Sequence, residues 1–266
     1  MLRLLCAITL LLVGCNQQTN EPPETPFASG KWIDLSYDFS AETPYWPTSE
    51  PFRLDTAFEG TTPGGYYYSA YNFCAAEHGG THLDAPVHFA EGKWSTEQIP
   101  LESLTGVAVV IDVSEKAADN PDYEITLEDI QAWEQANGQI ADHSIVLFRT
   151  GYGSRYPDAK EYLGTGERGE AAVAQLHFPG IAPAAAEWLI NNRKIKAIGI
   201  DTASIDFGQS TDFRTHQIFY GANIPGFENV ANLDKLPAKG AYVVALPMKI
   251  KGGSGAPLRI VAWLQK

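Results

Sequence analysis

Apolar residues gather in short runs along the chain, and these runs are rich in β-branched side chains. Runs of about four to eight such residues, bounded by glycine or polar segments, are typical of strands buried inside a sheet. We therefore expect strands at residues 107–113, 144–148, 197–200, 242–246 and 258–264.

Between these runs the apolar spacing changes to that of amphipathic helices. Thr126 is a good N-cap for a helix that continues through Trp133 and stops at Gly138. Pro183 opens a second helix, which presents Leu189 on its apolar face. Strands that alternate with helices predict an α/β fold.

Residues 151–180 are rich in glycine and polar side chains. Connections of this length without regular structure are uncommon and are often functional. We expect a long surface excursion close to a site. His177 lies inside it, and the sequence leaves open whether this side chain contacts a substrate or serves the structure of the loop.

Residues 1–14 have the features of a signal peptide. Arg3 precedes an apolar run at 4–13, which is too short to span a bilayer as a helix of about 20 residues. The run ends in Leu12-Val13-Gly14-Cys15, which resembles a bacterial lipobox, so we expect lipidation at Cys15. The alternative is an ordinary signal peptide that happens to end near a cysteine.

Residues 15–30 are expected to form a lipidated, flexible tether, because they are polar and contain three prolines. The folded domain is expected to span residues 31–266. These features predict a protein of the bacterial cell envelope that is held to the membrane by its N-terminal lipid alone. Asn16, where an aspartate would favour the inner membrane, favours the outer membrane facing the periplasm.

The charge balance excludes one class of partner. The chain has 19 Lys and Arg against 32 Asp and Glu, a net charge of −13. Nucleic acids and anionic lipid surfaces are bound by clustered basic side chains, so neither is expected as an electrostatic partner. After loss of Cys6 and lipidation of Cys15, Cys74 alone remains, so no intrachain disulfide is expected. Cys74 is expected to be a small buried residue rather than a nucleophile.

The chemistry is concentrated in residues 78–89, with the sequence HGGTHLDAPVHF. Three of the six histidines of the chain fall here, together with an aspartate. Imidazole and carboxylate groups are the usual ligands of zinc, manganese and iron. A lone histidine is more often structural, but three with an aspartate and bend-forming residues favour a metal site.

The spacing of this segment predicts a bent strand or loop. His78, His82, Asp84 and His88 are all even-numbered and share one face of an extended chain. A straight strand would spread them over roughly 33 Å, too far for one ion, so the chain must bend. A helix is possible, but two glycines in it cost about 2 kcal/mol relative to alanines.

A second polar cluster lies downstream and contains His216 and Glu228, each uninformative by itself. Residues 78–89 closely resemble the signature of the metal-dependent cyclase family, which includes bacterial kynurenine formamidases and isatin hydrolases. The resemblance extends over most of residues 32–264, including segments 43–47, 201–206 and 245–249. It implies a swivelling β/β/α fold with a barrel-like central sheet ringed by helices, and homodimers or higher oligomers.

The resemblance also implies roles for single residues. His78, His82 and Asp84 match ligands of a first metal, Asp84 would bridge to a second, and the further ligands would be His216 and Glu228. Isatin hydrolases typically hold a single manganese, so one or two ions, zinc or manganese, are expected.

Three more residues match positions around the substrate. His88 matches the catalytic acid/base of the family, and Trp46 matches an aromatic that packs on the substrate. Tyr45 is expected to extend that flat apolar wall.

Two hypotheses from different classes follow. The first is a metal-dependent hydrolase of an amide next to an aromatic ring, with N-formylkynurenine as the leading substrate and isatin-like cyclic amides as the alternative. The second is a periplasmic metal-binding or ligand-binding lipoprotein without turnover. His88 favours the enzyme, because a site already filled by five ligands has no use for it as a sixth.

Overall fold

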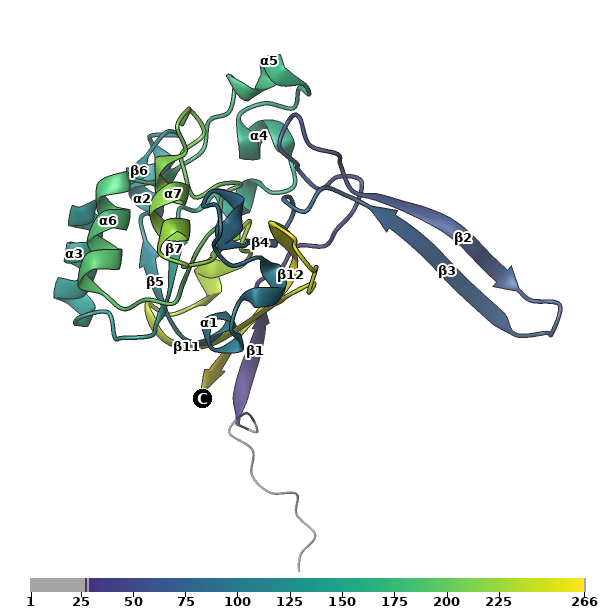
Figure 1. The fold of residues 1–266 in the computed structure, drawn as a ribbon, viewed down its shortest axis with the longest axis horizontal. Helices are drawn as coiled ribbons and strands as arrows, with labels where there is room; N and C mark the ends of the chain where they lie inside the picture. Colours follow the sequence, from purple (N-terminus) through teal and green to yellow (C-terminus); the bar gives the residue numbers. More distant parts are fainter. Residues whose placement is uncertain (1–26, 28, 266) are drawn as a thin grey trace, which may run out of the picture.

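The central element of the protein is a closed, barrel-like sheet. The computed structural model describes residues 27 and 29–265, so the expected signal peptide and Cys15, the expected site of lipidation, lie outside the described residues. The strands follow the order β1-β12-β11-β5-β7-β9-β10-β4, and β12 also pairs with β4. That last pairing closes a ring of seven strands and leaves β1 outside it, which confirms the expected fold class (Figure 1).

The strands predicted from apolar runs form one wall of this barrel. Strands β5, β7 and β9 pair in parallel, whereas β11, β12, β4 and β1 add antiparallel neighbours. All five predicted strands are present. The bounds of the eight strands are Gly30–Asp34 (β1), His82–Asp84 (β4), Thr105–Asp112 (β5), Ile145–Arg149 (β7), Ala197–Ile200 (β9), Gly226–Glu228 (β10), Lys239–Pro247 (β11) and Gly255–Gln265 (β12).

Two apolar cores explain why the runs are continuous rather than alternating. On β5, Ala108 and Val110 face the barrel interior, whereas Val109 and Ile111 face the helices. A strand covered on both faces needs apolar side chains at every position. The interior core also contains Leu83 and Phe227, from the strands that carry the site.

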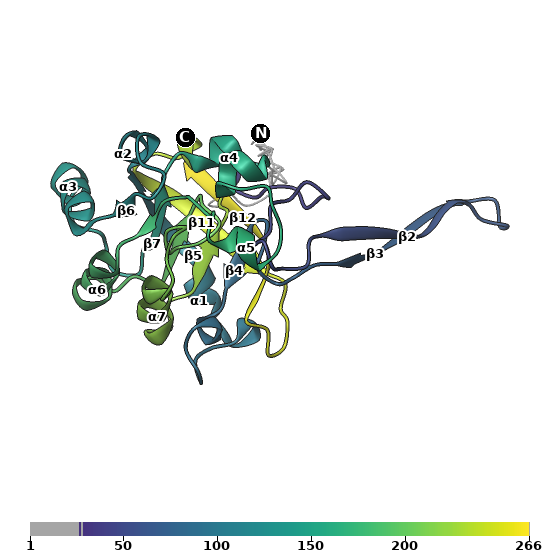
Figure 2. The ribbon, with the colours of Figure 1, turned by 90° about the horizontal axis from the view of Figure 1, so that it is seen from above.

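The three longest helices lie together on one side of the barrel, as both views show (Figure 2). Helix α3 (Leu127–Asn137) is capped by Thr126, whose hydroxyl accepts from the Asp129 amide, while the Asp129 carboxylate accepts from the Thr126 amide. Helix α6 (Pro183–Asn192) begins at its proline. Both helices therefore form where the sequence predicted them. Helix α7 (Arg214–Gly221) packs beside α6.

Residues 151–180 form an irregular excursion with short helical turns and a core of its own. Tyr152, Tyr162 and Phe178 are fully buried there, and Trp46 packs against them. The excursion is therefore fixed against the segment that carries Trp46. The short elements of the excursion are η3 (Tyr152–Arg155), α4 (Ala159–Leu163) and α5 (Glu170–Val173), and it ends at β8 (Gly180–Ile181).

The other short elements of the described chain are η1 (Pro86–His88), η2 (Thr96–Gln98), α1 (Leu101–Leu104), α2 (Ser114–Ala118), β6 (Glu124–Ile125) and η4 (Leu233–Lys235).

A two-stranded hairpin projects away from the barrel on the side opposite the helices (Figures 1 and 2). It consists of β2 (Arg53–Thr61) and β3 (Tyr67–Cys74), and nearly every residue in it is exposed. No apolar run predicted these strands. The expectation that Cys74 is buried is wrong, because it ends β3 in the exposed hairpin. Within the described part of the chain, no helix has the length and apolar character to cross a membrane.

Candidate metal centre and active site

Strand β4 supplies the centre of the site. Leu83 is fully buried in the barrel interior, so the alternation of the strand turns His82 and Asp84 to the opposite face. Strand β4 lies between β10 and β12, and its register places Glu228 directly across from His82. Three-residue strands thus align two carboxylates and an imidazole on one buried surface.

The loop before β4 bends as the glycines predict, and residues 78–81 form no helix. Gly80 has a φ of +58°, a conformation that favours glycine. A Cβ on Gly79 would lie 2.2 Å from the Tyr45 ring. Tyr45 is buried behind this loop and does not line the cavity. The structure places it as a support for residues 78–80 rather than as a wall for substrate.

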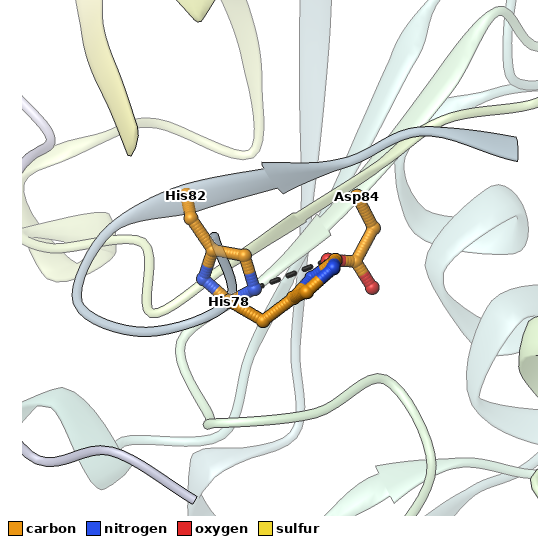
Figure 3. Close-up of side chains that lie close together, drawn as sticks. All are labelled: His78, His82 and Asp84. Carbon is orange, nitrogen blue, oxygen red and sulfur yellow. Dashed lines mark hydrogen bonds and ion pairs between the residues drawn. The ribbon is translucent and has the colours of Figure 1, made fainter. Parts of the chain in front are cut away.

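His78 turns back from this loop toward Asp84 (Figure 3). Its Nδ1 lies 2.6 Å from Asp84 Oδ1, and its Nε2 lies 2.9 Å from the Ser254 hydroxyl. The imidazole packs on the backbone of β12, where a Cβ on Gly255 would lie 2.4 Å from His78 Cε1.

His216 enters from helix α7 on the other side of Asp84. Its Nε2 lies 3.5 Å from Asp84 Oδ2 and 3.3 Å from Glu228 Oε1. Its Nδ1 is bonded to Asp206 Oδ2 at 2.5 Å, and that bond directs Nε2 into the site. Glu228 also accepts from the Ile205 amide.

The buried carboxylates and imidazoles shift one another's pKa values. Burial alone would raise the pKa of Asp84, but the charges of His78 and His88 and the hydrogen bonds from His216 and His78 hold it well below its usual range. Burial and the charge of Asp84 raise the pKa of Glu228. Burial opposes ionisation of His82 as well, yet the nearby charges of Asp84 and Glu228 raise its pKa to about 9. A cation satisfies the same electrostatic demand.

The donor set fits one or two divalent cations. His78, His82 and Asp84 bring one ligand atom each to within 4.8 Å of the others, and Asp84, His216 and Glu228 form a second such group. His82 Nε2 is buried without a hydrogen bond although Asp84 Oδ1 and Glu228 Oε2 lie 3.1 and 3.4 Å away. An unsatisfied imidazole nitrogen between two carboxylates is the arrangement that a bound cation completes.

His88 lies beside this cluster and makes none of its close contacts with carboxylates. The segment Pro86–His88 is a 3₁₀ turn. The chain is therefore not extended at His88, and the expectation that His88 shares one face of an extended chain with His82 and Asp84 does not hold there. The turn instead stacks the His88 ring on His78, with centroids 3.8 Å apart. Burial lowers the pKa of His88 to about 4, which the charges of His78, His216 and His82 reinforce and Asp84 opposes.

The cluster forms the base of a cavity of about 240 Å³. Trp46, Phe89 and Phe213 contribute aromatic surface to its lining. Trp46 is held between Phe178 and Phe213, with ring centroids 6.3 Å from each. His177 is exposed and is not part of the lining; its Nδ1 lies 2.9 Å from Asp122, a residue that precedes β6, so it joins the excursion to that segment.

Sequence reasoning missed the residues that orient the ligands. Tyr220 is fully buried and donates from its hydroxyl to Asp84 Oδ2 at 2.8 Å. Asn229 donates to the Gly80 carbonyl, which in turn bonds His82 Nδ1. Asp206 belongs to segment 201–206 of the family resemblance, but the sequence assigned it no role. Its separation of ten residues from His216 matches no helix or strand period that would indicate a contact. Phe213 and Ser254 were missed for the same reason.

Comparisons with known proteins agree with this geometry. The family model named Cyclase matches residues 33–207, which is more than half of the chain. The chain belongs to the cyclase family. Isatin hydrolase of Roseibium aggregatum is 34% identical over 92% of this chain and 89% of that protein. Kynurenine formamidase of Salinibacter ruber is 29% identical over 86% of this chain and 95% of its own.

Solved structures of cyclase family members have the same fold. Isatin hydrolase A of Ralstonia solanacearum superposes with a TM-score of 0.81 at 35% identity, covering 89% of this chain and 92% of that one. An isatin hydrolase bound to the product analogue thioisatinate also gives 0.81, at 30% identity, over 90% and 94%. Together with the ligand cluster, these likenesses identify this cyclase family member as a metal-dependent hydrolase.

Proposed function

We propose that the protein hydrolyses a cyclic amide fused to an aromatic ring, as in isatin, to the ring-opened acid. The observation that carries the proposal is a cluster of buried carboxylates and imidazoles at the base of an aromatic-lined cavity. Similarity supports the cyclic substrate, because isatin hydrolases match this chain at 34% and 35% identity. The sequence alone had ranked N-formylkynurenine first.

The residues divide into a hydrolytic base and an apolar wall. His78, His82, Asp84, His216 and Glu228 would hold the cation, and a bound divalent cation polarises a carbonyl and lowers the pKa of water. The remaining work falls to side chains of this chain that do not ligate.

His88 is positioned for proton transfer. Its ring borders the cavity beside His78 and makes no close contact with a carboxylate. In hydrolysis, oxygen from water joins the carbonyl carbon, the carbon–nitrogen bond breaks, and one proton moves from the water to the leaving nitrogen. His88 takes that proton and returns it. Trp46 and Phe213 hold the flat ring so that its carbonyl faces the cluster.

A second candidate is an arylformamidase that releases formate from N-formylkynurenine. Kynurenine formamidases match 86–88% of this chain at 25–29% identity, and the same base would serve both reactions. The distinction depends on the cavity, since a linear formamide with an amino acid tail needs a charged partner for that tail. Among the described residues that line the cavity there is no Lys or Arg, which favours the cyclic amide.

Purified protein tests the proposal directly. Isatin, formanilide and N-formylkynurenine are compared as substrates by absorbance, with and without chelator. We expect turnover of isatin that chelator abolishes and added metal restores. Turnover of N-formylkynurenine alone would replace the proposal with the second candidate. Elemental analysis of the same preparation decides between zinc and manganese and between one ion and two.

We also propose that the protein acts at the cell envelope, anchored by a lipid on Cys15. The support is the apolar run at 4–13 followed by Leu12-Val13-Gly14-Cys15. Mass spectrometry of the mature N-terminus from the native host tests it, and Cys15→Ser should block processing or release soluble protein. An unmodified N-terminus at another residue would contradict it.

A further inference from the structure

The histidines of the metal-binding cluster are not all held in the same way. His82 lies on strand β4 and His216 on helix α7, and their side chains are only 2% and 4% exposed. His78 lies in the loop before β4, and 24% of its side chain is exposed. Because neither regular structure nor full burial fixes the His78 ring, its orientation depends on the side chains around it.

His216 and His82 are each oriented by an oxygen that can only accept a hydrogen bond. His216 Nδ1 is bonded to the Asp206 carboxylate at 2.5 Å, and His82 Nδ1 lies 2.9 Å from the Gly80 carbonyl. The nitrogen that faces such an oxygen carries the proton, so the other nitrogen of each ring is left for a cation.

His78 meets a hydroxyl instead, and a hydroxyl can both donate and accept. Its Nε2 lies 2.9 Å from Ser254 Oγ, which in turn lies 2.7 Å from Glu77 Oε2. The carboxylate accepts the single hydroxyl hydrogen, so Ser254 Oγ is left to accept from His78 Nε2. In the neutral imidazole this leaves Nδ1 without a proton on the side of the cluster, where it lies 2.6 Å from Asp84 Oδ1 (Figure 3).

We propose that Glu77 is a positioning residue for the metal centre: acting through Ser254, it selects the His78 tautomer that binds the cation through Nδ1. Glu77 does not line the cavity and acts on the centre only through its neighbours. The inference rests on the cation that the proposed function requires, and it holds whichever amide is the substrate.

The segment that carries Ser254 is shaped around this contact. Glu77 Oε2 also accepts from the Ser254 amide at 3.0 Å, so one oxygen holds both the backbone and the hydroxyl. A Cβ on Gly253 would lie 2.8 Å from Glu77 Oε1, and one on Gly255 would lie 2.4 Å from His78 Cε1. The two glycines that flank Ser254 therefore allow the segment to approach both partners closely.

Glu97 makes a comparable contact with the same segment. Its Oε2 accepts from the Gly252 amide at 2.9 Å, two residues before Ser254. Among the described residues, Glu97 has no hydrogen bond to a histidine or to a side chain that bonds one. Glu97 thus supports the backbone as Glu77 does, without a hydroxyl between it and a ligand, and it provides a matched control.

The carboxylate behind the hydroxyl also strengthens the ligand. Its negative charge polarises the Ser254 hydroxyl and, through it, the N–H of His78, which makes Nδ1 a better electron-pair donor. Asp206 has the same effect on His216 by direct contact. Changing the partner of a ligating histidine usually weakens metal affinity about 10–100-fold, so the effect of Glu77 is measurable.

Zinc affinity of the full chain, purified in detergent and measured by competition with a chelator, tests the proposal without any substrate. Glu77→Ala and Ser254→Ala should each weaken the affinity about 10–100-fold, whereas Glu97→Ala should leave it unchanged. Because Glu77 acts through the hydroxyl, the double variant Glu77→Ala/Ser254→Ala should bind zinc no more weakly than Ser254→Ala alone.

The tautomer of His78 supplies a readout that a merely structural role would not move. In the zinc-loaded chain labelled with ¹⁵N-histidine, two-bond NMR correlations show which ring nitrogen carries the proton. We expect His78 to be protonated at Nε2 and bound to zinc through Nδ1. In Glu77→Ala this N–H signal should be lost to exchange with solvent, while the signals of His82 and His216 remain. Binding of zinc through Nε2 of His78 overturns the proposal.

The possible failures can be told apart, and circular dichroism verifies that each variant is folded. A wild-type chain that binds neither zinc nor manganese overturns the cation site and the proposed mechanism with it. A wild-type chain that binds zinc, with Glu77→Ala binding it equally well, overturns only the role of Glu77. Equal losses in Glu77→Ala and Glu97→Ala, or additive losses in the double variant, would show that Glu77 only holds the backbone, and they also overturn the proposal.

Discussion

Strand β4 and the hairpin formed by β2 and β3, called the arm below, are close in the sequence but lie in different surroundings. Every residue of β4 is buried: Leu83 faces the barrel core, and His82 and Asp84 face the site. In the arm, Leu54 and its neighbours face solvent on both sides. The barrel thus provides a wall that holds buried charged groups close together. The arm is exposed along almost its whole length and has no core of its own.

The largest effect is expected at Asp84, which belongs to both ligand groups. Asp84→Asn keeps the shape but removes the charge that binds cation, so kcat/KM should fall on the order of 10³-fold or more, with loss of metal. Asp55→Asn, an exposed carboxylate of the arm, is the control and should change neither. Full metal content in Asp84→Asn, measured by elemental analysis, would place the site elsewhere.

The next effect separates ligand from acid/base at His88. His88→Ala should cut kcat by about 10²–10⁴, the usual contribution of a general acid or base. Metal stoichiometry should remain, because His88 makes no close contact with Asp84 or Glu228. Both quantities are measured on one preparation. Metal lost in proportion to activity would make His88 a ligand.

Core packing gives a direct comparison of the two regions. Leu83→Ala leaves a cavity in the barrel and should lower the free energy of unfolding by about 2–5 kcal/mol. Leu54→Ala removes the same atoms from the exposed arm and should stay within about 0.5 kcal/mol in the monomer. Urea denaturation at low protein concentration measures both. Equal losses would mean that the arm carries part of the monomer core.

A smaller effect is expected at Asp206, which holds His216 in place. Asp206→Asn should weaken metal affinity about 10–100-fold, the usual effect of changing the partner of a ligating histidine. Competition with a chelator of known affinity gives the value. Unchanged affinity would show that helix α7 alone orients His216.

The smallest effect concerns pH and stability at Asp129, the residue that closes the cap of α3. Burial would raise its pKa, but hydrogen bonds from Lys116, Tyr123 and Thr126 lower it. Because the pKa of Asp129 is lower in the folded protein, its ionised form stabilises the fold at pH values above the unfolded pKa of about 3.9. This stabilisation is lost as the pH falls through the folded pKa. Asp129→Asn should therefore cost about 1 kcal/mol at pH 7. The difference from wild type should vanish in acid, as measured by thermal unfolding against pH.

The sequence by itself determined the elements whose signals are local. Strands such as β5 are buried on both faces, so the need for apolar side chains appears at every position. The caps of α3 and α6 depend on Thr126 and Pro183 and on residues within one turn of them. The metal-binding cluster was predictable in part because His78, His82 and Asp84 are close in the chain.

What the tertiary structure decided depends on contacts between distant segments. The pairing of β12 with β4 closes the barrel, and no residue pattern within either strand specifies it. Tyr45 is buried because Gly79 leaves room for its ring. Tyr220 and Asp206 act on ligands that other elements supply, so spacing alone could not assign them. The strands of the arm were not predicted for a related reason. A periodic apolar pattern arises where one face of a strand packs on a core, and both faces of the arm are exposed.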